Sequence, residues 1–176
     1  MSLTALLAPY QDKLTAPTDE EIAARAALHE RLRVTDDYMR VYRSGALSLD
    51  LAQDIGAPGD EVPRWASNIS VLGRAEDPAI EDMPKTLASV FYFLGSDYGG
   101  GFVFQISRGK WRGRLAGIED SYVESFEYGE VDVPDAPITD DEAADAYLEG
   151  LRKSVLSIYD LDLEQFLTLR LQHAAG

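Results

Sequence analysis

The stretch SVFYFLGSDYGGGFVFQIS, residues 89–107, decides the fold of this chain. Its two runs of aromatic and β-branched residues, at 91–94 and 102–106, are typical of strands. The three glycines between them, 99–101, tolerate the positive φ that a tight connection between strands requires. A glycine-rich phosphate loop must instead lead into a helix, and here a second strand-like run follows. The stretch therefore predicts a β-hairpin, and we expect no anion site at these glycines.

Three more segments resemble strands, at 64–72, 110–118 and 121–129. Their spacing of about ten residues and their glycine turns predict an antiparallel meander. Around the start of the second segment, basic residues recur at every second position, which would align them on one face of a strand. They are Arg108, Lys110, Arg112 and Arg114. Such a stripe could bind nucleic acid, but cross-strand pairing with Glu124 and Glu127 explains it better in a net acidic chain.

Helices are expected before this sheet. Thr18 and Glu21 form the pattern of a capping box, which predicts a helix over about 19–33. A shorter helix follows, with Thr35 as its cap and Gly45 beyond its end. Residues 3–14 are expected to add a turn or two of helix.

Helical patterns also follow the sheet. Thr139 and Glu142 repeat the capping-box spacing, and apolar residues then recur at steps of three and four as far as Ile158. The segment 162–172 fits either a helix or a strand, and we favour the helix. Together these patterns predict an α+β fold with N-terminal helices, a central antiparallel sheet of about five strands, and a C-terminal helix or helices.

The composition is that of a packed globular protein. At 176 residues, of which 45% are hydrophobic, the chain can bury a substantial core, and we expect one domain over 1–176. It has no cysteine, which excludes disulfides, cysteine-ligated metals and thiol catalysis. No apolar stretch is long enough to span a membrane, and the first residues lack the pattern of a secretion signal. We therefore expect a cytoplasmic protein.

Acidic residues dominate one part of the chain, whose net charge is −15. No lysine or arginine lies between Arg114 and Arg152, while residues 119–149, the acidic region, carry twelve carboxylates. They are Glu119, Asp120, Glu124, Glu127, Glu130, Asp132, Asp135, Asp140, Asp141, Glu142, Asp145 and Glu149. Such a region repels nucleic acid and anionic membranes and attracts a basic partner, with association rates raised by about 10- to 1,000-fold. We expect it to face outward as a docking surface; the alternative is that it serves only solubility.

Residues that commonly perform catalysis or bind metals form no recognisable pattern. The two histidines, His29 and His173, are not spaced as metal ligands, and a structural or solvated role is favoured for both. No serine or threonine stands in a nucleophile-elbow context, and DIGAPGDE at 54–61 lacks the register of a calcium loop. Carboxylate pairs discriminate nothing in a chain with 31 acids. We therefore predict no enzyme, no catalytic residues and no metal or cofactor.

Three short motifs resemble those of the SUKH superfamily of small α+β proteins. They are EIAARAALHERLRVTDDYMRVYRSG at 21–45, FYFLGSDYGGGFVFQI at 91–106 and GKWRGR at 109–114. The first is similar to the family's N-terminal helix and its "DY" helix, and the second to its glycine-turn hairpin. The matching positions are Asp37, Tyr38 and Gly45, and then Gly95, Asp97, Gly100 and Gly101. The resemblance covers residues 20 to about 118.

This resemblance implies a bacterial immunity protein that binds and neutralises a cognate toxin domain, frequently a nuclease or deaminase, in the producing cell. The family brings no shared catalytic residues. The acidic region fits this function, because an enzyme that acts on nucleic acid has a basic cleft that clustered carboxylates can occupy. The residues expected to bind the toxin are Glu119, Asp120, Glu124, Glu127, Glu130, Asp132 and Asp135. The alternative is an interaction module of the same fold with a regulatory or scaffolding partner, and an acidic enzyme is the third and least favoured interpretation.

Overall fold

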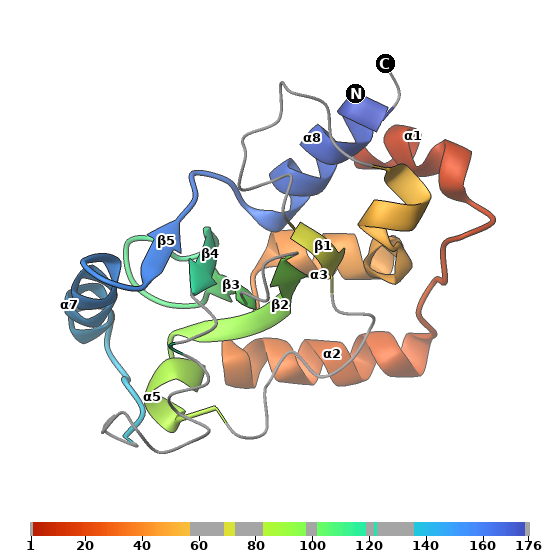
Figure 1. Ribbon diagram of the computed structural model, residues 1–176. Helices are drawn as coiled ribbons and strands as arrows, with labels where there is room; N and C mark the ends of the chain where they lie inside the picture. Colours follow the sequence, from red (N-terminus) through yellow and green to blue (C-terminus); the bar gives the residue numbers. More distant parts are fainter. Residues whose placement is uncertain are drawn as a thin grey trace.

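The computed structural model of this chain describes residues 2–56, 69–72, 83–97, 102–118, 122 and 136–174. In these residues helices pack on both faces of an antiparallel sheet (Figure 1). The α+β class and the antiparallel sheet predicted from the sequence are therefore confirmed.

The sheet has five strands in the order β1-β2-β3-β4-β5, and all neighbouring strands are antiparallel. The strands are β1 (Ile69–Leu72), β2 (Phe91–Asp97), β3 (Phe102–Ile106), β4 (Leu115–Ile118) and β5 (Leu156–Ile158). Gln105 of β3 lies opposite Tyr92 on β2 and Leu115 on β4. The first four strands follow chain order, whereas β5 comes from much later in the chain and adds to the edge of β4.

Alternate residues of the sheet pack into two separate hydrophobic clusters, because successive side chains of a strand point to opposite faces. One cluster contains Tyr92, Leu94, Val103 and Leu115, and the other contains Phe91, Phe104, Ile106, Ala116 and Ile118. Both faces are therefore buried. This explains why β2 is apolar from Phe91 to Leu94 and why β3 is apolar except for Gln105, without regular alternation of polar residues.

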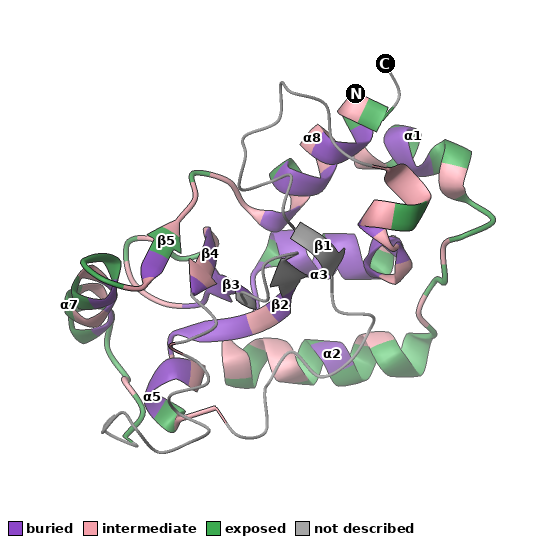
Figure 2. Cartoon of the chain, in the orientation of Figure 1, coloured by how far each residue is buried: buried purple, intermediate pink, exposed green. Residues whose placement is uncertain are grey.

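Helices from both ends of the chain cover the first face. They are α1 (Leu3–Leu7), α3 (Asp36–Arg43) and α8 (Leu163–Ala174). Tyr38 of α3 and Phe166 of α8 are buried against the sheet. A longer helix, α2 (Asp19–Leu32), lies outside them and is mostly exposed (Figure 2). Its buried residue is Arg25, whose guanidinium carbon lies 4.7 Å from the centre of the Tyr42 ring.

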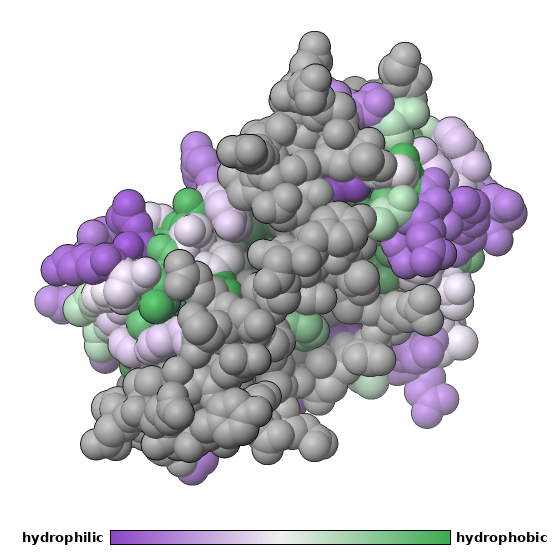
Figure 3. All heavy atoms as spheres, in the orientation of Figure 1, coloured by the Kyte–Doolittle hydropathy of each residue, from purple (hydrophilic) through white to green (hydrophobic). Residues whose placement is uncertain are grey.

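Two helices cover the second face. They are α5 (Lys85–Ala88) and α7 (Asp141–Arg152), and they bury Leu87, Ala144, Leu148 and Leu151 against the sheet. The opposite side of α7 is exposed (Figure 2), and the end of the molecule formed by α7 is strongly hydrophilic (Figure 3). Short 3-10 turns at Ala8–Tyr10 and Ala46–Ser48 and a π-helical turn at Leu51–Ile55 complete the described elements.

Two capping boxes set the start of α2 and α8. The backbone N–H of Thr18 donates to Oε2 of Glu21 at 2.7 Å, and Oγ1 of Thr18 accepts from the N–H of Glu21 at 3.2 Å. Asp162 and Gln165 form the same reciprocal pair at 3.0 and 2.8 Å. These bonds satisfy amide groups that have no partner inside a helix. The predictions of a helix over 19–33 and of a helix at 162–172 are confirmed.

The other two predicted caps differ from the sequence-based expectation. Thr35 does precede α3, but its Oγ1 lies 2.9 Å from the phenol oxygen of Tyr92 and makes no cap bond. The predicted cap at Thr139 is wrong, because Oδ1 of Asp140 accepts the bond from Ala143 at 2.7 Å. Helix α7 therefore begins one residue later than expected.

The predicted strand at 110–118 is wrong in its first half. Strand β4 begins only at Leu115, and residues 110–113 form a turn. Gly109, just before the turn, and Gly113, its last residue, have positive φ of 82° and 89°. The basic residues before Leu115 therefore do not share one face of a strand. The long helix expected as far as Ile158 is also wrong, because α7 ends at Arg152 and Leu156–Ile158 forms β5.

Two predicted strands lie wholly or partly outside the described residues. Residues 64–68 belong to the first of them, and 121–129 except Tyr122 to the second. In the part of the chain that the structure describes, no helix has the length and apolar character needed to cross a bilayer.

Candidate functional site

The predicted toxin-binding residues all lie outside the described residues. They are Glu119, Asp120, Glu124, Glu127, Glu130, Asp132 and Asp135. The residues on either side of them are well defined. Ile118 pairs with Phe102 and Leu156 at the end of β4, while on the other side Ala136 and Ile138 are bound to α5 and to the residue that follows it.

The hydroxyl groups of Thr86 and Ser89 form hydrogen bonds with the backbone of residues 136–138. Oγ1 of Thr86 donates to the carbonyl of Ala136 at 2.7 Å and accepts from its N–H at 3.3 Å. Oγ of Ser89 accepts from the N–H of Ile138 at 2.8 Å. The segment 119–135 is thus bounded by the sheet at one end and by α5 at the other.

In the second half of the acidic region Asp140, Asp141 and Glu142 are exposed, as expected, but four of the five carboxylates have partners within the chain, which the sequence-based expectation did not include. Asp140 caps α7, and the carboxylates of Asp141, Asp145 and Glu149 contact residues 108–110. Helix α7 therefore packs against the sheet with its apolar side and binds the turn before β4 with part of its acidic side. Basic side chains pair with Asp141 and Glu149, whereas Asp140 and Asp145 accept from backbone N–H groups.

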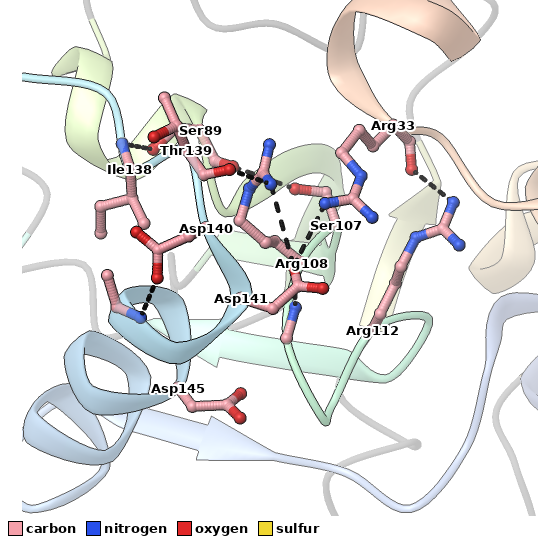
Figure 4. A network of polar contacts seen from close by, with 12 residues as sticks. Arg33, Ser89, Ser107, Arg108, Arg112, Ile138, Thr139, Asp140, Asp141 and Asp145 are labelled. Atoms are coloured by element: carbon pink, nitrogen blue, oxygen red, sulfur yellow. Dashed lines mark hydrogen bonds and ion pairs between the residues drawn. The ribbon is translucent and has the colours of Figure 1, made fainter.

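Oδ1 of Asp141 accepts two hydrogen bonds and forms an ion pair with a second guanidinium (Figure 4). It lies 3.2 Å from the backbone nitrogen of Gly109, 3.2 Å from Nη1 of Arg33 and 3.8 Å from Nη1 of Arg108. We call the group formed by Arg33, Arg108 and the N–H of Gly109 the Asp141 site. Next to it, Oδ1 of Asp145 accepts from the N–H of Lys110 at 2.7 Å.

Three elements bring these donors together. Arg33 ends α2 in a left-handed conformation with φ 55°, and its carbonyl accepts from Nη2 of Arg112 at 3.4 Å. Arg108 donates from Nη1 to the carbonyl of Thr139 at 2.7 Å, just before α7. Gly109 has a positive φ, and the successive N–H groups of Gly109 and Lys110 donate to two different carboxylates, those of Asp141 and Asp145. A Cβ at this position would overlap Oδ1 of Asp145, whose side chain would have to move.

The electrostatic environment keeps Asp141 ionised. The hydrogen bond from the N–H of Gly109 lowers the pKa of the Asp141 carboxyl below its usual range, and Arg33 and Arg108 act in the same direction. The side chain is nevertheless 61% exposed. The site is therefore an anion site at the surface, and it is filled by a carboxylate of the same chain.

The indole of Trp111 lies beside this site. Nζ of Lys110 is 4.0 Å and the guanidinium carbon of Arg152 is 5.2 Å from its ring centre, and both side chains also contact Glu149. Cations above an indole are attracted by its ring quadrupole. The tryptophan thus links the turn to the end of α7 and can report on their contact.

A buried polar network that the sequence did not reveal lies between α3, the sheet and α8. Oδ2 of Asp37 accepts from Nε2 of Gln105 at 2.8 Å and from the N–H of Leu163 at 3.1 Å. The phenol of Tyr92 donates to Oε1 of Gln105 and accepts from the N–H of Thr35. Burial raises the pKa of the Tyr92 phenol far above its usual range. All of these residues are buried, each with 7% exposure or less, and we interpret the network as part of the fold.

Two open depressions mark the surface of α2 and α3. One, of about 490 Å³, is lined by Ala26, His29, Glu30, Asp36, Met39, Arg40 and Arg43, and the other, of about 310 Å³, adjoins Tyr42 and Gly45. Nε2 of His29 lies 3.4 Å from Asp36 in the first. Among the described residues, no three His, Cys, Asp or Glu side chains are grouped as metal ligands.

Comparisons with protein-family models, with curated proteins and with solved structures give no match to this chain. The similarity to the SUKH superfamily therefore rests on the sequence motifs alone, and the function that it implies is a proposal.

Proposed function

We propose that this protein is an immunity protein of the SUKH type, which binds and neutralises a cognate toxin domain with a basic surface. Binding would centre on the carboxylates of residues 119–135, and the toxin domain would be of nuclease or deaminase type. The proposal places no reaction on this chain and no nucleic acid or membrane at its surface.

The observation that carries the proposal concerns the cations that flank this segment in the sequence. Each of them has a partner outside residues 119–135. The pairs are Arg108 with Asp141, Lys110 with Glu149, Arg112 with the carbonyl of Arg33, Arg114 with Asp160 and Arg152 with Glu149. The segment itself holds seven carboxylates and no lysine or arginine. No basic residue within the segment offsets this negative charge, and an external cation could pair with it.

A basic toxin would supply such cations. Nucleases and deaminases that bind nucleic acid carry arginine and lysine in their clefts, and carboxylates make short, charge-assisted hydrogen bonds with those groups. A partner that covers the cleft also excludes the substrate. Because the attraction acts over a distance, it would accelerate association more than it slows dissociation.

The residues that carry the family resemblance support a role in the fold. Asp37 and Tyr38 are buried, and Gly45 has φ 78° with a backbone so close to Thr15 that a Cβ would lie 2.9 Å from its carbonyl oxygen. Such positions preserve an architecture while the surface varies. A family whose members share a fold and bind different toxins would keep residues of this kind.

The decisive experiment is copurification with the product of the neighbouring gene, followed by measurement of the association rate at several salt concentrations. Reversal of three charges, Glu124→Lys, Glu127→Lys and Asp132→Lys, should slow association by at least about tenfold and flatten its salt dependence. The matched control reverses three exposed acids elsewhere, Asp12→Lys, Glu20→Lys and Glu30→Lys, which changes the net charge equally.

The control decides between local docking and a general effect of charge. Equal slowing in both variants would contradict a docking surface at 119–135. A stable partner that is not a toxin would instead favour the alternative, an interaction module with a regulatory or scaffolding role.

A further inference from the structure

The Asp141 site has the construction of an external anion site, although its present occupant belongs to the chain. Two guanidinium groups and one backbone N–H converge on a single carboxylate oxygen. The successive N–H groups of Gly109 and Lys110 both donate to carboxylates, and turns that expose such N–H groups can bind anions. The start of α7, whose dipole favours negative charge, adjoins the site.

The occupant can leave without disturbing the fold. Asp141 is the first residue of α7, and its side chain is 61% exposed, so a rotation of χ1 carries the carboxylate into solvent. The helix would stay in place, because Ala144, Leu148 and Leu151 remain buried against the sheet. The separate bond between Asp145 and the N–H of Lys110 would also remain.

The site has more N–H groups than a single carboxylate oxygen can accept hydrogen bonds from. Within the described residues, Nε of Arg108 is buried and has no hydrogen-bond partner. A buried donor without an acceptor is costly, and a larger anion with more oxygens could accept from it or from its neighbours. A phosphate group carries three acceptor oxygens and up to two negative charges, against one charge for a carboxylate.

We propose that Arg33, Arg108 and the N–H of Gly109 form a binding site for a phosphate-class oxyanion, and that the carboxylate of Asp141 competes with this ligand as a tethered internal occupant. The other acids nearest to the site have partners elsewhere and do not occupy it. Asp140 is held by the N–H of Ala143 and Asp145 by that of Lys110. More distant carboxylates are screened beyond about 8 Å at physiological salt.

This site is independent of the proposed toxin-binding function. It takes an anion and lies on described residues, whereas the toxin would bring cations to residues 119–135. It is also distinct from the glycines at 99–101, for which we expected no anion site.

The test is a titration of the full 176-residue chain with inorganic phosphate at pH 7.5 and constant ionic strength. Binding is measured from the ¹H–¹⁵N chemical shifts of the amides of Gly109 and Lys110. Removal of the tethered competitor in Asp141→Ala should lower the half-saturating phosphate concentration by about tenfold or more, because a tethered group acts at a high effective concentration. Asp141→Asn serves the same purpose and keeps the size of the side chain.

A matched control separates competition from net charge. Glu142→Ala removes an equal charge from the next, exposed residue without opening the site, and it should bind phosphate like the wild type. In the double variant Asp141→Ala with Arg108→Gln, the gain should be lost. Equal affinities of the Asp141→Ala and Glu142→Ala variants, or an unchanged Gly109 amide, would overturn the proposal.

Two further ligands define the chemical class and its source. Acetate at the same concentrations should shift the Gly109 amide far less than phosphate, and equal shifts would overturn the assignment to a phosphate-class anion. Phenyl phosphate tests whether a phosphoryl group on a larger molecule enters. If phenyl phosphate binds as tightly as inorganic phosphate, the natural ligand is a phosphorylated molecule. If only inorganic phosphate binds, the ligand is the free ion.

Discussion

Asp37 and Gln105 lie 68 residues apart in the sequence, and Oδ2 of the first accepts a 2.8 Å hydrogen bond from Nε2 of the second. The same oxygen accepts from the N–H of Leu163 at the start of α8, and Nε2 of Gln105 also donates to the carbonyl of Gly113 at 2.7 Å. One buried carboxylate thus joins α3, the centre of the sheet and α8. It also connects, through Gln105, to the turn that carries the Asp141 site.

Replacement of Asp37 by alanine should lower the free energy of unfolding by about 2–3 kcal/mol, because buried donors on Gln105 and Leu163 lose a charged acceptor. Asp36→Ala is the matched control, since its side chain is 89% exposed on the same helical turn. Asp36→Ala should lower the free energy of unfolding by about 0.5 kcal/mol, because it removes the interaction of Asp36 with the helix dipole. Urea unfolding of both variants measures the difference. Similar costs would show that the network contributes little.

Tyr92→Phe should destabilise the protein by about 1–2 kcal/mol at neutral pH, because the N–H of Thr35 and Oε1 of Gln105 lose their partner. A pH effect should follow. The pKa of Tyr92 is raised in the folded state, so above about pH 10 the unfolded chain loses a proton that the folded chain keeps, and stability falls as pH rises. Unfolding free energies at pH 8 and 10.5 should show a smaller loss in Tyr92→Phe than in the wild type. Identical losses would exclude this residue as the cause.

Gly109→Ala should cost more than Gly56→Ala. Both glycines have positive φ, 82° and 87°. An alanine in this conformation lowers the free energy of unfolding by about 1 kcal/mol in either variant. At Gly109 the new Cβ would also overlap Oδ1 of Asp145 and break its bond to Lys110, whereas nothing lies within 4 Å at Gly56. An excess of about 1 kcal/mol is expected for Gly109→Ala in thermal or urea unfolding. If the two variants cost the same, the contact between α7 and the turn contributes nothing to stability.

Asp140→Ala should destabilise the protein by about 1 kcal/mol, because it removes the oxygen that accepts from the N–H of Ala143. Thr139→Ala should have little effect, since only the backbone carbonyl of Thr139 binds Arg108. Urea unfolding of the pair tests which residue caps α7. A larger loss of unfolding free energy for Thr139→Ala would show that Thr139 caps α7, as predicted from the sequence.

The sequence predicted the elements whose signals are local. The capping box at Thr18 and Glu21, the glycine after α3 and the hairpin of β2 and β3 all depend on residues within a few positions of one another. Backbone amides at a helix start and φ at a turn are satisfied by such neighbours, so short patterns suffice to identify them.

The errors arose where tertiary contacts override a local pattern. The alternation of Arg108, Lys110, Arg112 and Arg114 resembled one face of a strand. Charged side chains do not hold a strand against a hydrophobic core, however, and Gly109 and Gly113, which have positive φ, allow a turn here. Val155 and Ile158 continued a helical period by coincidence. Pairing of Leu156–Ile158 with the free edge of β4 places this segment in the sheet.

The candidate site was predictable only in part. The excess of acids over 119–149 is visible in the composition, yet the pairing of Asp141 with Arg33 joins residues 108 positions apart. No spacing rule encodes such a contact. The burial of Asp37 was hidden for the same reason, because an aspartate at the start of a helix is usually explained by the helix dipole.

The addition of β5 from late in the chain has a consequence for biosynthesis. A ribosome completes β1 to β4 and α3 before it makes Leu156, so the nascent chain carries an unpaired sheet edge at β4 and an unmatched Asp37 until α8 emerges. Exposed edges of this kind invite pairing between molecules. Translation products that stop near residue 155 should consequently aggregate, whereas chains extended through residue 174 should remain dispersed.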